Sequence, residues 1–109
     1  MQNKPVFRID KFVVPAITKD RFLGRLTVTH DAMDAAAGCE QNFIPEQVDG
    51  RGQYNIVTLV KWKDRECYEA AKKRAVSRQA EEGFNPAAFM KELGVVADLG
   101  NYTVLQAAS

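Results

Sequence analysis

Four side chains in this sequence have types and positions that suit small-molecule chemistry. Trp62 ends a candidate strand and Tyr68 lies one turn into the candidate helix that follows, so we expect the two rings to converge. Their N–H and O–H groups then either bind a ligand or find partners in ordinary packing. His30, the only histidine, falls inside the apolar arc of an earlier candidate helix. It is either a proton-transfer group that lines a cavity or an imidazole held by a backbone carbonyl.

The fourth side chain, Arg78, shares a face of its candidate helix with Cys67, Ala71 and Ala75. Small residues at this spacing leave volume between the helix and the sheet that it covers. A guanidinium at the edge of that volume suits an anionic or oxygen-rich ligand. The alternative is an ion pair with a neighbouring acid such as Glu82 or Glu81.

Several kinds of site and partner are not expected. The sequence has no Ser-His-Asp set, phosphate-binding glycine loop, carboxylate pair or metal-ligand spacing, so neither a metal nor a cofactor is predicted. Fifteen Lys and Arg against fourteen Asp and Glu leave a net charge of +1, which gives no footprint for nucleic acid or an anionic membrane. There is no apolar run of about 20 residues, and Met1 to Pro5 have no apolar run behind them, so we expect neither a membrane span nor a signal peptide. Cys39 and Cys67 make no disulfide framework, and we expect a cytoplasmic protein.

The elements that must position these side chains fit in one domain, since 109 residues leave no room for two. A strand over 6–14 precedes a helix from the N-cap Thr18 to Ala37, stopped by Gly38. The remaining elements are a strand over 39–48, a turn at 49–52, a strand over 53–62, a helix from the N-cap Asp64 to Glu82, a short helix between Asn85-Pro86 and Gly94, and a strand over 97–105. The order β-α-β-β-α-(α)-β predicts an α+β, ferredoxin-like βαββαβ fold with its core in residues 6–105.

Both faces of the expected sheet are apolar. The strand over 53–62 carries Val57 and Leu59 with Asn55 on one face, and the other face has Tyr54, Ile56, Thr58, Val60 and Trp62. Helices cover only one face of a ferredoxin-like sheet, so a second copy is the economical cover for the other. We therefore predict a homodimer with its two sheets packed face to face. The alternative is a monomer whose twisted sheet is fully buried by an unusual placement of its helices.

A resemblance to a known family extends over residues 6–105. The first strand VFRIDKFVVP, the helix ending Ala-Gly-Cys and the segment NIVTLVKWKDRECYEAAKK resemble the antibiotic biosynthesis monooxygenase superfamily of dimeric α/β barrels. Members that oxidise polycyclic phenols without metal or flavin carry an Asn, a Trp, a Tyr and an Arg in the pocket. Trp62 and Tyr68 match the Trp and Tyr positions, and Arg78 lies about one helical turn short of the Arg position. Thr58 stands at the Asn position, with Asn55 on the opposite face of the same strand.

The resemblance implies a cofactor-independent monooxygenase that acts on a small electron-rich quinol or phenol. In this interpretation Trp62 and Tyr68 polarise the substrate oxygen, Arg78 stabilises negative charge and His30 moves protons. The expected substrate-binding residues are Asn55, Thr58, Tyr54, Phe22 and Met33.

Two other functions remain open on this fold. The first is a non-catalytic or stress-related dimeric barrel that binds a small ligand, and the second is an isomerase or cyclase. Haem-degrading members resemble the chain less, because they need a histidine late in the second helix, where this sequence has Arg78, Gln79 and Ala80.

Overall fold

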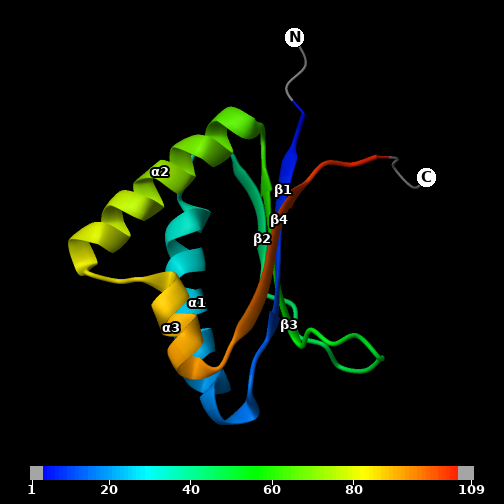
Figure 1. Cartoon of the computed structure of the whole chain (residues 1–109). Coiled ribbons are helices and arrows are strands. Elements are labelled where there is room, and N and C mark those ends of the chain that lie inside the picture. Colours follow the sequence, from blue (N-terminus) through cyan, green and yellow to red (C-terminus); the bar gives the residue numbers. More distant parts are fainter. Residues whose placement is uncertain (1–3, 106–109) are drawn as a thin grey trace.

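Four antiparallel strands form one sheet in the order β2-β3-β1-β4, and the helices cover one of its faces (Figure 1). This computed structural model describes residues 4–105. The elements are β1 Val6–Val13, the 3-10 helix η1 Ala16–Thr18, α1 Lys19–Asp34, β2 Cys39–Phe43, β3 Ile56–Trp62, α2 Arg65–Glu82, α3 Pro86–Leu93 and β4 Val96–Tyr102. The predicted ferredoxin-like fold is confirmed. None of the described helices is long and apolar enough to span a bilayer.

Local signals in the sequence determine the ends of α2 and α3. The Asp64 carboxylate accepts a hydrogen bond from the backbone N–H of Cys67 at 2.9 Å, which begins α2. Asn85 caps α3 in the same way, through the N–H of Ala88 at 3.0 Å, and Pro86 follows at the first helical position. α2 ends at the C-cap Gly83 and α3 ends at the C-cap Gly94, as predicted.

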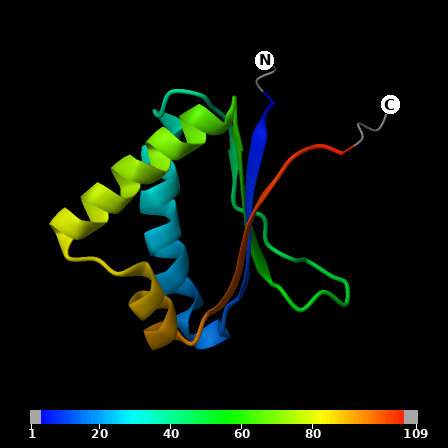
Figure 2. The same ribbon diagram turned by 45° about the horizontal axis from the view of Figure 1, so that its top comes forward.

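The predicted ends of other elements were wrong by several residues. α1 ends at Asp34 rather than Ala37, because the chain already turns there toward β2. Thr18 holds the N-cap position, but its hydroxyl donates to the carbonyl of Leu93 at 2.7 Å and caps nothing. The strand predicted over 39–48 ends at Phe43, and β3 begins three residues later than predicted, at Ile56. The segment between them forms a loop that projects from the sheet on the side away from the helices (Figures 1 and 2).

The core lies between the sheet and the helices, in two clusters. One cluster packs around an edge-to-face pair of Phe12 and Phe22, whose ring centroids are 5.0 Å apart. The other contains Val60, Trp62 and Tyr68 and lies where α2 leaves β3. Because α2 diverges from the sheet beyond this cluster (Figure 2), the space beneath it is not filled by a continuous core.

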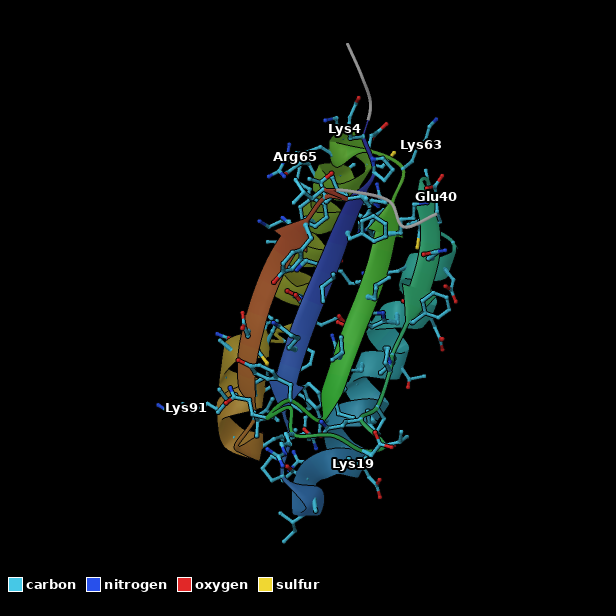
Figure 3. All side chains as sticks on the ribbon, turned by 90° about the vertical axis from the view of Figure 1, so that its right-hand side faces the viewer. Lys4, Lys19, Glu40, Lys63, Arg65 and Lys91 are labelled. Carbon is cyan, nitrogen blue, oxygen red and sulfur yellow. The ribbon has the colours of Figure 1, made fainter. Side chains whose placement is uncertain are left out.

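The opposite face of the sheet carries no helix, and Figure 3 shows it from the front with the helices behind. Apolar side chains alternate onto it from all four strands. Half-exposed Ile9 and Leu59 lie at its centre, and Phe43, Val96 and Tyr102 are exposed toward its edges. The predicted second apolar face therefore exists, while the predicted homodimer stays a prediction.

Candidate active site

A cavity of about 240 Å³ lies between the sheet, α1 and α2. β1 and β3 form its floor, and the divergence of α2 from the sheet keeps it open. Its lining residues are Arg8, Asp10, Ala32, Met33, Ala36, Val60, Trp62, Tyr68, Ala71, Lys72, Arg74, Ala75 and Arg78. The volume predicted from the small residues of the second helix is therefore present.

Trp62 and Tyr68 meet at one end of this cavity, as the sequence predicts. Trp62 is the last residue of β3 and Tyr68 lies in the first turn of α2, so the Asp64 cap determines how the two rings meet. Trp62 is 2% exposed and Tyr68 is 6% exposed. Both rings pack in the same cluster, with Val6 and Val60, and this packing holds their polar edges in place.

An Arg8–Asp10 ion pair on β1 is the part of the site that the sequence analysis missed. Arg8 Nε donates to Asp10 Oδ1 at 2.8 Å, with both side chains largely buried. Arg8 Nη1 donates to the hydroxyl oxygen of Tyr68 at 3.1 Å and lies 3.4 Å from Asn101 Oδ1. One guanidinium thus joins a carboxylate to the phenol of Tyr68. Among residues 4–105 the Tyr68 hydroxyl has no acceptor, so its proton can be donated to a ligand.

Asp10 occupies an environment that disfavours its charge. Burial raises the pKa of the Asp10 carboxyl above its ordinary value of 3.8. The charge and hydrogen bond of Arg8 offset part of this effect, and a backbone hydrogen bond from Gly100 and the nearby His30 also act to lower the pKa. A carboxyl group with a raised pKa that lines a cavity is a typical feature of functional sites.

The cavity is electropositive as a whole. Asp10 is the one carboxylate among its lining residues, against four cations: Arg8, Lys72, Arg74 and Arg78. The alternative in which Arg78 pairs with Glu82 is not found, because Glu82 Oε1 lies 3.5 Å from Arg25 Nη2 instead. Within residues 4–105 Arg78 has no ion pair, so its guanidinium is available to an anionic or oxygen-rich ligand.

A second cavity of about 270 Å³ adjoins the first, and both are lined by Arg8 and Asp10. It lies toward α3 and is mostly apolar, with Phe12, Phe84 and Leu99 among its lining residues. Phe22, predicted to bind substrate, lines this second cavity, whereas Met33 lines the first. Thr58 is 2% exposed and pairs with Asp10 in the β1–β3 ladder, but it lines neither cavity.

Three other predicted residues lie outside both cavities. His30 is buried, but its Nδ1 contacts Asn42 Oδ1, and its carbonyl accepts from Asn42 Nδ2 at 2.7 Å. Asn55 binds the backbone of Val14, accepting from its N–H at 2.8 Å and donating to its carbonyl at 2.9 Å.

Tyr54 is on the wrong face of the sheet for the predicted role. Its hydroxyl donates to Asp98 at 3.2 Å, and the Lys11 ammonium lies 5.3 Å from its ring centroid. Both contacts are on the face without helices, because Lys11 and Asp98 pair on adjacent strands there. The predicted alternation holds from Ile56 to Trp62 but does not extend to Tyr54, because β3 begins only at Ile56.

A signal for the missed pair is present in the sequence. Arg8 and Asp10 stand two residues apart on a strand whose same-face neighbours, Val6 and Phe12, are apolar. Two charges of opposite sign on the core face of a strand indicate a paired, partly buried site rather than a solvated surface.

Comparisons with known proteins bear on the fold alone. No protein-family model matches the chain, and no curated protein matches it significantly. Among solved structures, a presumed monooxygenase from Shewanella loihica superposes with a TM-score of 0.75 at 17% identity, over 98% of this chain and 100% of that one. SnoaB, a cofactor-independent oxygenase from Streptomyces nogalater, superposes with a TM-score of 0.68 at 19% identity, over 95% of this chain and 96% of SnoaB. The haem-degrader MhuD from Mycobacterium tuberculosis superposes with a TM-score of 0.67 at 19% identity, over 95% of this chain and 99% of MhuD.

The chain therefore shares its fold with these three proteins, and the resemblance noted in the sequence is supported at the level of the fold.

Proposed function

We propose that this protein is a cofactor-independent oxygenase that acts on a small, electron-rich hydroxyarene such as an anthrone or a naphthol. The observation that carries the proposal is the cavity beneath α2, which is lined by Trp62 and Tyr68 at one end and by Arg78 farther along the helix. The fold shared with SnoaB, a cofactor-independent oxygenase, supports the same class of reaction.

In this reaction the substrate supplies all the electrons. An anthrone loses a proton to give a carbanion whose charge is shared with its oxygen, and this anion transfers an electron to O2. Recombination forms a hydroperoxide, which eliminates water to leave a quinone. One oxygen atom enters the product, the other leaves as water, and the methylene carbon provides the four electrons. The protein must stabilise the oxyanion and exclude bulk water.

The residues of the cavity divide this work. Tyr68 donates its free hydroxyl proton to the substrate oxygen, since its own oxygen accepts from Arg8. Trp62 lines the cavity beside Tyr68 and helps to polarise the substrate oxygen, and Arg78 neutralises negative charge from the rim of the cavity. Met33 and, in the adjoining cavity, Phe22 supply apolar surface for the rest of the molecule.

The structure of MhuD with two bound haems raises the question of whether this chain could bind haem. The only histidine of this chain contacts Asn42 and lines neither cavity, and the late part of α2 carries Arg78 and Gln79 where haem-degrading members have a histidine. The residues present do not fit a histidine-ligated haem, and no step is assigned to one.

The proposal includes a homodimer that buries the face of the sheet without helices. That face presents apolar side chains at its centre and edges, including Leu59 and Phe43, and a second copy presents the same surface about a two-fold axis. The loop between β2 and β3 projects on this side (Figure 1) and would lie against the partner. A cytoplasmic location is part of the same proposal, since both cysteines are free.

Oxygen uptake by the metal-stripped protein tests this function, over a panel of anthrones, naphthols and hydroquinones. Saturable uptake that is lost in Trp62→Phe is expected. The exposed Val76→Ala on α2 is the matched control and should keep the wild-type rate. No uptake with any substrate would overturn the oxygenase and favour a ligand-binding barrel or an isomerase on the same fold.

A further inference from the structure

One carboxylate, Asp10, lies at the junction of the two cavities and has no role in the chemistry described above. Its position in the middle of β1 places it on the floor of both cavities, with Trp62 and Tyr68 on one side and the apolar lining toward α3 on the other. A substrate that extends from one cavity into the other must pass over this group. A charged side chain that is largely buried there calls for a function, because burying it costs free energy.

We propose that Asp10 is the proton acceptor of the site, and that Arg8 is a positioning residue that fixes the position of Asp10 relative to Tyr68. The proposal rests on the function proposed above and identifies its substrate more closely. The ligand would be a hydroxyarene with an acidic C–H or O–H group that faces Asp10 while its oxygen faces Tyr68.

The geometry of Arg8 supports this assignment. Its guanidinium binds Asp10 Oδ1 through Nε at 2.8 Å and the Tyr68 oxygen through Nη1 at 3.1 Å. The proton acceptor and the hydrogen-bond donor to the substrate oxygen are therefore held by one rigid, planar group. Only Oδ1 is used by Arg8, so the carboxylate retains lone pairs for a substrate proton.

The proton transfer balances without a further reactant. The substrate C–H or O–H bond breaks, its electron pair stays on the substrate, and an O–H bond forms on Asp10. The charge moves from the carboxylate to the substrate oxygen, where Tyr68 and the cations of the rim stabilise it. The raised pKa of Asp10 assists this step, because it makes the carboxylate a stronger base.

The charged and titratable groups around Asp10 come from each element packed against it. Arg8 flanks it on β1, and His30 on α1 is close enough to affect its charge. Tyr68, Lys72, Arg74 and Arg78 line the first cavity from α2, and Arg25 lines the second from α1. His30 was the proton-transfer group expected from the sequence, but its contacts with Asn42 leave it outside the cavities, and Asp10 takes that role.

The test separates binding from proton transfer in the absence of O2. Metal-stripped protein is mixed anaerobically with anthrone, and two signals are followed. Quenching of Trp62, the only tryptophan, reports binding, and the long-wavelength absorption of the anthrone anion reports deprotonation. In Asp10→Asn we expect unchanged quenching and anion formation slower by about 100-fold or more. Asp10→Glu should recover part of the rate, and the exposed Asp31→Asn on α1 should match wild type.

The outcomes are distinguishable. Wild-type protein that neither binds anthrone nor forms its anion would overturn the proposed function and this inference with it. If wild type and Asp10→Asn form the anion equally fast, Asp10 is not the acceptor, although the oxygenase stands. If Asp10→Asn does not fold, the rate of anion formation by the wild-type protein is measured as a function of pH. A rate that falls at acid pH along the titration curve of a carboxyl group supports Asp10, and a pH-independent rate overturns the assignment.

Discussion

Replacing Tyr68 with Phe removes a single oxygen from the site and leaves the ring in place. The hydroxyl oxygen accepts one hydrogen bond, from Arg8 Nη1 at 3.1 Å, and the ring packs with Val60 and Trp62. Tyr68→Phe therefore keeps the packing and deletes one charge-assisted hydrogen bond, together with the O–H group assigned above as donor to the proposed substrate.

The size of the effect follows from what Arg8 keeps. A hydrogen bond to a charged group contributes about 1.5–3 kcal/mol to stability. Arg8 retains Asp10 at 2.8 Å, so its guanidinium is not left unpaired and the loss of stability should be about 1 kcal/mol. In a domain of this size, that corresponds to a fall in Tm of roughly 4–8 °C. For turnover, loss of one donor to the developing oxyanion should lower kcat by about 100-fold, with KM little changed.

Urea unfolding measures the first effect, and initial rates of oxygen uptake over a range of substrate concentrations measure the second. Val76→Ala on the exposed side of α2 is the control for both. An unchanged kcat would remove Tyr68 from the chemistry. A raised KM with normal kcat would mean that the hydroxyl only binds substrate, and would refute its assignment to the transition state.

Four further predictions concern stability and assembly. Gly38→Ala should destabilise the fold by about 2 kcal/mol or more in urea, because φ is +82° and the added Cβ would lie 2.5 Å from Cys67 Sγ; an unchanged midpoint would contradict this. Burial raises the pKa of Asp10, so ionising this carboxyl costs stability, and the free energy of unfolding of wild type relative to Asp10→Asn should decrease as pH rises above about 4. The N-cap hydrogen bond lowers the pKa of Asp64, so the free energy of unfolding of wild type relative to Asp64→Asn should decrease as pH falls below about 4. Leu59→Arg, at the centre of the face without helices, should convert a dimer to a monomer in light scattering, and a wild type already monomeric would refute the proposed interface.

The sequence predicts the elements well where a capping residue or a glycine marks an end. Asp64, Asn85 and Gly94 each stand where the pattern indicates, because these signals act within a few residues of one another. The end of α1 was placed too late, since Ala35–Ala37 favour a helix and only the connection to β2 requires a turn there. Tertiary demands of this kind are not visible in local propensity.

The candidate site was predicted in part for similar reasons. Trp62 and Tyr68 converge because a strand end and the first turn of the next helix are close in sequence. Arg8 lies sixty residues from Tyr68, so their hydrogen bond depends on the whole sheet and cannot be read from spacing. Tyr54 was misplaced because the long loop before β3 breaks the alternation that assigned its face.

The most direct test of the proposed oxygenase follows the oxygen atoms. Metal-stripped protein is given the best substrate of the panel under ¹⁸O₂, and the quinone product is analysed by mass spectrometry. The proposed reaction predicts one labelled oxygen in each product molecule, at a rate that falls in Trp62→Phe and Tyr68→Phe but not in Val76→Ala. Unlabelled product, or label that appears equally fast without the protein, would contradict it.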